Sequence, residues 1–165
     1  MSTTLTSNKN YLQPTGFKFV IDRKHYGNLE YFAQGVTHPG ASVQPLELPT
    51  TRVTSIPLAG DKINYGQLQL DIILDENMES YIEMQNWLDR IVNQGHVDEN
   101  TTAVYPTYSD ITVLILSSHN NKTVKIKYND CIPTELGQIS LASNTADVSY
   151  LTFTASFRFT NFEIS

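Results

Sequence analysis

Residues that carry out covalent catalysis are sparse in this chain. Its single cysteine, Cys131, is flanked by Asp130 and by Ile132-Pro133. A nucleophilic cysteine needs a nearby base and an electropositive setting that lower the pKa of its thiol, and neither adjoins Cys131. Free cysteines are also among the most buried residue types. We therefore expect a buried structural thiol, and one cysteine rules out a disulfide within the chain.

Metal and acid–base sites have equally little support from residue spacing. The four histidines fall on different predicted turns, and no two have the i, i+4 spacing of a helical metal site. They are His25, His38, His96 and His119. The carboxylates of Asp75 and Glu76 precede a predicted helix, where such groups cap the backbone and favour the helix dipole. The sequence therefore predicts no catalytic residue, no metal ligand and no bound cofactor.

Charge and length limit the classes of function. The chain has 165 residues, and 17 acidic against 11 basic side chains give a formal net charge of −6. This balance opposes tight wrapping of a nucleic-acid backbone, although an acidic wall suits a conduit that must not adhere to DNA. The first ten residues contain no apolar run, and no segment reaches transmembrane length, so we expect synthesis in the cytoplasm without a signal peptide.

Alternating apolar and polar residues predict a mainly β protein. The clearest case is residues 150–160, where one face carries aliphatic and aromatic side chains and the other carries hydroxyls and Arg158. The apolar face consists of Leu151, Phe153, Ala155, Phe157 and Phe159. Shorter alternating runs at 17–21 and 68–74 predict two further half-buried strands.

Turn residues predict where the strands connect. Residues 111–116 and 123–128 flank a polar cluster at 117–122 that contains two asparagines, which tolerate left-handed turn conformations. We predict a β-hairpin at this point. His38-Pro39-Gly40 likewise predicts a turn.

One stretch, residues 78–93, has the spacing of an amphipathic helix. Apolar side chains recur at three- and four-residue steps, Asp75 precedes the helix as a cap, and Gly95 follows it as a stop signal. A single helix must lean on the sheet to bury its apolar side. We expect Trp87, in the middle of this helix, to pack in the core.

The segment at about 42–62 is long, interrupted by prolines and rich in aliphatic residues. An isolated domain buries such a segment with difficulty, so it is a candidate to fold as an extended hairpin that docks on a neighbouring subunit. The alternative is a long loop that covers its own core. The predicted contact residues are Pro45, Leu46, Leu48, Pro49, Val53, Ile56, Pro57 and Leu58.

The order of these features resembles the tail tube proteins of contractile-tailed bacteriophages. The resemblance begins with Pro14-x-x-Phe17 and continues with Gly60-Asp61-Lys62 ahead of the 68–74 strand. It then follows Asp75-Glu76-Asn77 into the helix with Trp87, and closes with Pro133-Thr134-x-x-Gly137-x-x-x-Leu141 before the C-terminal strand. It spans about residues 12–162.

The length of the chain predicts a single domain over residues 1–165, in which we expect residues 1–12 to form a flexible N-terminal arm. The fold that the resemblance implies is a tail-tube-like β-barrel or sandwich of two packed antiparallel sheets, with one flanking helix at about 78–93 and a long hairpin or loop at about 42–62. The resemblance also implies hexameric rings stacked into a tube in the virion tail, through which DNA is ejected. The implied partners are the tail sheath, tape-measure and baseplate proteins.

Two alternatives remain open from the sequence. The Ser/Thr-rich N-terminal extension and the proline-dense segment also suit a tube-initiating baseplate protein or a tail-terminator ring of the same fold. A different class is a monomeric β-sandwich that binds carbohydrate or a host surface, with Tyr105 and Tyr108 as candidate contacts.

Overall fold

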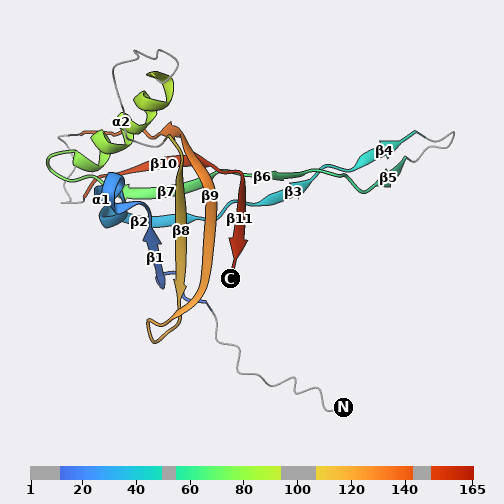
Figure 1. Cartoon of the computed structure of the whole chain (residues 1–165), viewed down its shortest axis with the longest axis horizontal. Helices are drawn as coiled ribbons and strands as arrows, with labels where there is room; N and C mark the ends of the chain where they lie inside the picture. The colour runs from blue at the N-terminus through green and yellow to red at the C-terminus, as the bar shows by residue number, and fades with distance from the viewer. Residues whose placement is uncertain (1–11, 50–54, 94–106, 143–149) are drawn as a thin grey trace.

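The computed structural model describes residues 12–49, 55–93, 107–142 and 150–165, which contain eleven strands and two helices (Figure 1). The first half of the chain contains β1 (Phe17–Val20), α1 (Arg23–Phe32), β2 (Ala33–Thr37), β3 (Ala41–Val43), β4 (Leu46–Leu48), β5 (Ile56–Leu58), β6 (Ile63–Tyr65) and β7 (Leu68–Ile73). The second half contains α2 (Glu79–Asn93), β8 (Ser109–Leu116), β9 (Lys122–Leu136), β10 (Thr152–Arg158) and β11 (Asn161–Ile164).

Seven strands form one antiparallel sheet in the order β1-β8-β9-β10-β7-β2, with β11 also paired to β9. The sheet has two halves, and the long strand β9 belongs to both. In Figure 1, β1, β8 and β11 run roughly across the direction of β10, β7 and β2. The predicted pair of packed antiparallel sheets is therefore present, but the two sheets share a strand. No pairing joins β1 to β2 among the described residues, so the sheet does not close into a barrel there.

A local irregularity lets β9 change from one half to the other. Residues up to Asn129 pair with β11, and residues from Ile132 onward pair with β10. Between them lies Asp130, whose φ of 54° is left-handed, and the register with β8 also shifts there. An extra residue of this kind bends a strand and increases its twist. The Asp130 N–H donates to Asp110 Oδ1 at 3.2 Å, which holds the bend.

The inner faces of both halves share one hydrophobic core with the helices. Phe153 and Phe157 of β10 are buried as predicted, and Trp87 of α2 is fully buried. The Trp87 ring stacks on Tyr26 of α1 with centroids 4.1 Å apart, and its Nε1 donates to the Thr107 carbonyl at 2.8 Å. The helix predicted at 78–93 is confirmed, as is the packing of its tryptophan.

The prediction of one flanking helix is wrong, because α1 is a second helix in the described part of the chain. It begins after Asp22, whose side chain accepts a hydrogen bond from Lys24 N, and it is kinked at Tyr26. Only Tyr26 and Leu29 are buried on it, so the sequence carries little helical periodicity. Tertiary contacts stabilise the helix instead: Glu83 of α2 accepts a hydrogen bond from Leu29 N at 3.1 Å. Neither described helix is long and apolar enough to span a membrane.

The other strand predictions are confirmed with changed boundaries. The hairpin predicted around 117–122 joins β8 to β9, and Asn120 in its turn has a φ of 59°. The second strand of that hairpin extends to Leu136, well beyond the predicted end at 128. The turn predicted at His38-Pro39-Gly40 is wrong, because these residues connect β2 to β3 without a turn.

Replacing Trp87 with alanine tests how much the shared core contributes to the free energy of unfolding. We expect Trp87→Ala to lower the free energy of unfolding by about 3–5 kcal/mol, because it leaves a cavity and removes a stacking partner. Urea denaturation measures the change. Tyr31→Ala is the control, since the Tyr31 side chain is 82% exposed and its removal leaves the core intact. Equal effects of the two substitutions would contradict the assignment of Trp87 to the core.

Candidate inter-subunit surface

The segment between β2 and β7 folds into a long double-stranded extension, which projects from the body of the molecule in Figure 1. We call the described residues 41–49 and 55–65 the hairpin. Strands β3 and β6 pair near the body, and β4 and β5 pair farther out. The predicted extended hairpin is therefore present, and the alternative of a loop that covers its own core is wrong. The hairpin lies outside the hydrophobic core.

Strand register gives each part of the hairpin an apolar face. Directly opposite residues in an antiparallel pair share a face of the ribbon. The apolar cross-strand pairs are Val43 with Ile63, Leu46 with Leu58, and Leu48 with Ile56. The opposite face carries the pairs Ser42 with Asn64 and Glu47 with Pro57.

All six of these aliphatic side chains are exposed, from 42% for Leu58 to 62% for Leu46. Burying one such side chain stabilises a folded or assembled protein by about 1.5–3 kcal/mol. An isolated chain that leaves six of them in water does not gain this free energy. Large exposed apolar patches mark interaction sites in folded proteins. The hairpin is therefore the strongest candidate for a docking surface among the described residues.

Proline and glycine shape the hairpin. Pro57 lies in β5, which pairs with β4 alone, and such edge strands are where a sheet tolerates proline. At Gly60 the two chains approach closely, and a Cβ atom there would clash with the carbonyl oxygen of Gln44. Only glycine fits that position without a backbone shift. This is a physical reason for the Gly60-Asp61-Lys62 motif noted in the sequence.

Seven of the eight predicted contact residues lie on the described part of the hairpin, and all seven are exposed. The eighth, Val53, lies outside the described residues. The structure adds Val43 and Ile63, which the predicted set omitted although they extend the apolar face toward the body. The alternation Ile63-Asn64-Tyr65 was the sequence signal that could have identified Ile63. Whether these residues contact another subunit stays a prediction.

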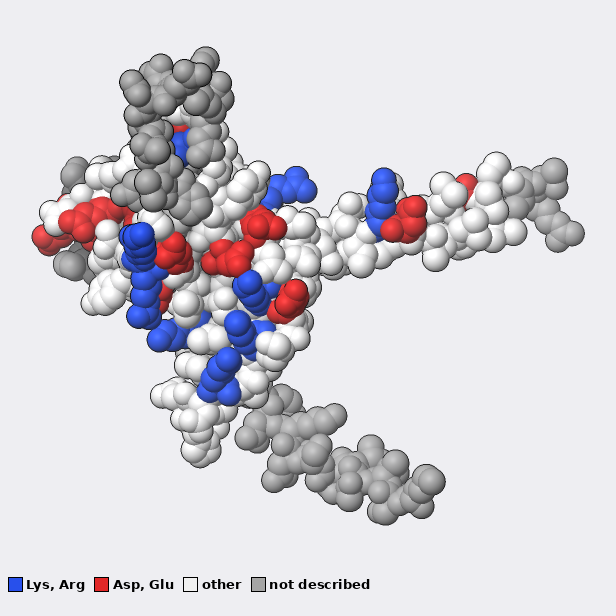
Figure 2. Space-filling view, viewed as in Figure 1, with Lys and Arg blue, Asp and Glu red and all other residues white. Residues whose placement is uncertain are grey.

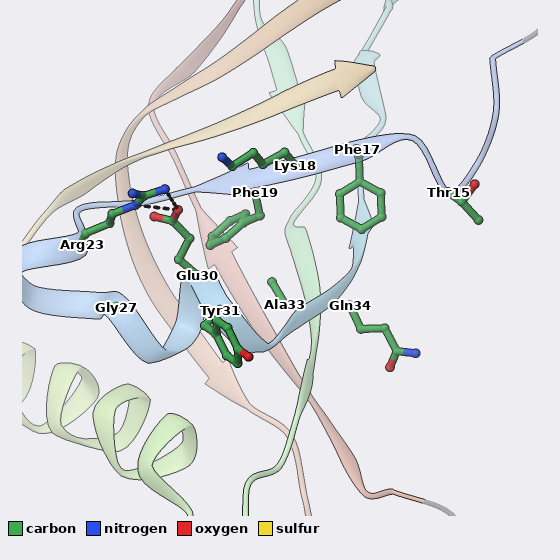
Figure 3. Close-up of a pocket in the computed structure, with 10 residues that line it drawn as sticks. All are labelled: Thr15, Phe17, Lys18, Phe19, Arg23, Gly27, Glu30, Tyr31, Ala33 and Gln34. Atoms are coloured by element: carbon green, nitrogen blue, oxygen red, sulfur yellow. Dashed lines mark hydrogen bonds and ion pairs between the residues drawn. The ribbon is translucent and has the colours of Figure 1, made fainter. Parts of the chain in front are cut away.

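The seam between the two ends of the sheet forms a second feature of the surface. A cavity of about 660 Å³ lies where β1, α1 and the start of β2 meet (Figure 3). Arg23 and Glu30 in its lining form an ion pair at 2.6 Å, and Lys18 adds a further positive charge. The second oxygen of Glu30 accepts the Ile21 N–H at 3.4 Å. The unpaired edges of β1 and β2 flank this seam, and free edges of this kind readily pair with another chain.

Cys131, the residue considered as a nucleophile, lies in surroundings typical of a structural residue. Cys131 is fully buried, and its Sγ donates to the Tyr128 carbonyl at 3.6 Å. Burial raises the pKa of this thiol to about 12, so at neutral pH it is not a thiolate. The prediction of a buried structural cysteine is confirmed. No group of three or more His, Cys, Asp or Glu side chains that could hold a metal ion occurs in the described residues.

Asp75 caps α2 as the sequence predicted. Its two carboxylate oxygens accept the N–H groups of Glu79 and Ser80 at 3.1 and 3.2 Å. Desolvation alone would raise the pKa of Asp75, but these hydrogen bonds lower it below the usual value. Of the tyrosines considered for a binding module, Tyr108 is 58% exposed and does not line the seam cavity, and Tyr105 lies outside the described residues.

Basic side chains gather on the outer face of the half formed by β1, β8 and β9. Lys18 and Lys125 lie on this face on either side of Leu114, in register across the three strands. Lys127, on the same face, pairs with Asp110 at 2.7 Å. Figure 2 shows lysine and arginine side chains over this region and acidic side chains mainly nearer the helices. The net charge of −6 is therefore unevenly distributed.

Comparisons with known proteins were made for the whole sequence and fold. A family model described as phage tail tube protein matches residues 3–165. No curated protein matches the sequence.

Many solved structures have a similar fold, among them the following three. The first is a chain of the tube-terminating cap of the anti-feeding prophage, with 11% identity over 100% of this chain and 99% of that chain and a TM-score of 0.68. The second, from the sheath–tube complex of the extracellular contractile injection system PVC in its extended state, has 11% identity over 100% and 98% and a TM-score of 0.66. The third, from the anti-feeding prophage baseplate, has 11% identity over 97% of both chains and a TM-score of 0.63.

The burial of Cys131 generates a test of its inertness. We expect a thiol-reactive chromogenic disulfide to leave Cys131 unmodified in the folded protein at pH 8, because the thiol is both inaccessible and protonated. It should react fully in denaturant. Ser42→Cys, which places a thiol on the exposed hairpin, is the positive control. Rapid modification of Cys131 in the folded protein would show that the site is open and reactive.

Proposed function

Because this chain belongs to the phage tail tube protein family, we propose that it self-assembles into stacked rings, each of six subunits, that form the tube. The observation that carries the proposal is the projecting hairpin, with six exposed aliphatic side chains arranged in cross-strand pairs. Such a surface is unfavourable in an isolated subunit and favourable between copies. The chain is a structural protein in this account and not an enzyme.

Within a ring, neighbouring subunits meet through different surfaces of the same chain. A head-to-tail contact of this type closes into a ring when its rotation divides a full turn. The described chain offers unpaired edges at β1 and β2, whose free N–H and C=O groups can pair with the next copy. Sheet edges joined in this way line a lumen.

Between rings, the hairpin makes the contact. It projects from the body, and its apolar pairs lie along both ribbons. Docked on the adjacent ring, these side chains leave water and hold the stack together. The predicted contact residues Leu46, Leu48, Ile56 and Leu58 belong to this surface, and Val43 and Ile63 extend it.

The assembled tube is a conduit in the virion tail through which DNA is ejected. The net negative charge suits this role, because a wall that repels phosphate does not retain the passing duplex. The implied partners are the sheath outside the tube, the tape-measure protein inside it during assembly, and baseplate proteins at its end. The subunits are made in the host cytoplasm before the tail assembles.

A second role is a ring at one end of the tube. Two of the structures with a similar fold are a tube-terminating cap and a baseplate, which supports a tube-initiating or terminating ring as the alternative. The two roles differ in the product of self-assembly. A main tube subunit forms long filaments, whereas an end ring forms single rings or short stacks.

Polar substitutions on the hairpin test the stacking contact. We expect the double variant Leu46→Thr and Leu58→Thr to form rings but not long tubes. Threonine keeps the strand preference of these positions, while each substitution removes apolar burial worth on the order of 1–3 kcal/mol per subunit. Negative-stain electron microscopy measures the length distribution.

The matched control is Glu47→Thr, which changes the opposite face of the same ribbon. It should leave the tubes unchanged, and far-UV circular dichroism verifies that all variants are folded. Tubes of normal length from the double variant would contradict the stacking role of the hairpin. Failure of the unmodified chain to form any ring would contradict the proposed function itself.

The conduit role also makes a prediction about DNA. We expect no saturable binding of a short duplex to the assembled protein between 50 and 200 mM salt, because the acidic balance disfavours phosphate contacts (about one counterion is released for each phosphate neutralised). Fluorescence anisotropy of a labelled duplex is the measurement. Tight binding that weakens steeply with salt would identify a DNA-binding protein instead.

A further inference from the structure

The hairpin joins the body through two short connections. Residues 38–40 lead from β2 to β3, and residues 66–67 lead from β6 to β7. Each connection contains a glycine, and the Gly66 N–H donates to the Gly40 carbonyl at 2.9 Å. A Cβ atom added at Gly40 would meet nothing within 4 Å, whereas one added at Gly66 would be in van der Waals contact with Pro39 and Gly40. Glycine has the widest choice of backbone angles.

An aromatic side chain from the far end of the sequence contacts the first connection and the last residue of the hairpin. Phe162 of β11 lies edge-on to His38, with ring centroids 5.0 Å apart and an interplanar angle of 85°. It also lies edge-on to Tyr65, at 5.3 Å and 66°. His38 precedes the first strand of the hairpin and Tyr65 ends the last one. One side chain of β11 therefore touches the hairpin where each of its two chains meets the body.

Phe162 is itself held by the body. Strand β11 pairs with β9, which places Phe162 opposite the fully buried Tyr128. The end of β11 is fixed by two hydrogen bonds between Lys125 and Ser165, at 2.8 and 2.9 Å. The Tyr128 hydroxyl is 2.6 Å from His38 Nδ1, so the same body strand also contacts the connection directly.

Phe159 completes this group of rings. Its centroid lies 5.6 Å from that of Tyr65 and 5.1 Å from that of Tyr128. We call His38, Tyr65, Tyr128, Phe159 and Phe162 the root cluster. Edge-to-face aromatic contacts at these distances are attractive and have a defined geometry, so they restrict orientation more than aliphatic contacts do.

We propose that Phe162 is a positioning residue that fixes the direction in which the hairpin leaves the body. The importance of that direction rests on the proposed function, since an inter-ring contact requires every hairpin to leave at the same angle. The ring of Phe162, packed between His38 and Tyr65, adds to the two short connections a contact that favours one angle.

Pulsed electron spin resonance tests the proposal on the full chain. Spin labels at Glu47→Cys on β4 and Gln69→Cys on β7 report the distance between hairpin and body; both positions are exposed, and buried Cys131 remains unlabelled. We expect a narrow distance distribution in the parent and a severalfold broader one in Phe162→Ala. Phe162→Tyr keeps the ring and should restore the narrow distribution.

Ile164→Ala is the matched control, because Ile164 lies on the same strand, is 62% exposed and belongs to none of the root-cluster contacts. It should leave the distribution narrow. If Phe162→Ala does not fold, Tyr65→Leu removes the partner ring and should broaden the distribution in its place.

The proposal is overturned if Phe162→Ala keeps the parent distribution, or if Ile164→Ala broadens it equally, since strand pairing alone would then set the direction. These outcomes do not depend on whether tubes form. In electron micrographs, Phe162→Ala should form fewer and shorter tubes than Ile164→Ala. Absence of tubes from the unmodified chain would count against the proposed function. The role of Phe162 would then be decided by the distance measurement alone.

Discussion

The bend in β9 at Asp130 is the constraint on which the rest of the structure depends. It lets one strand serve two halves of the sheet that cross at a large angle, and so places Phe153 and Phe157 against a core shared with α1 and α2. Without a shared strand, no backbone pairing would fix the orientation of one inner face relative to the other. The same geometry leaves β1 and β2 unpaired with each other, since the described sheet does not close.

A body built in this way separates stability from assembly. Its core contains the large buried side chains, whereas the hairpin carries exposed aliphatic pairs that contribute little to the fold of one chain. Substitutions in an extension of this kind can change its contacts without lowering the stability of the core. This chain belongs to the phage tail tube protein family, and in the assembly proposed above the hairpin surface would be completed by other copies.

The root cluster connects these two parts. It joins residues that are distant in sequence, since His38 and Tyr65 flank the hairpin and Phe162 lies near the C-terminus. The aromatic contact acts together with the two short connections to set the direction of the hairpin. The arrangement also gives β11, a short strand at the margin of the sheet, a role beyond covering an edge.

Local patterns in the sequence determined the strands at 17–21, 68–74 and 150–160, the helix at 78–93, the burial of Trp87 and Cys131, and the exposed hairpin, because each depends on the periodicity or composition of its own segment. Tertiary structure alone decided α1, the length and bend of β9, and the contact of Phe162 with the hairpin. Helix α1 buries only Tyr26 and Leu29, too few for a periodic signal. The bend and the aromatic contact arise from pairings between distant segments, and no local pattern encodes which strands will meet.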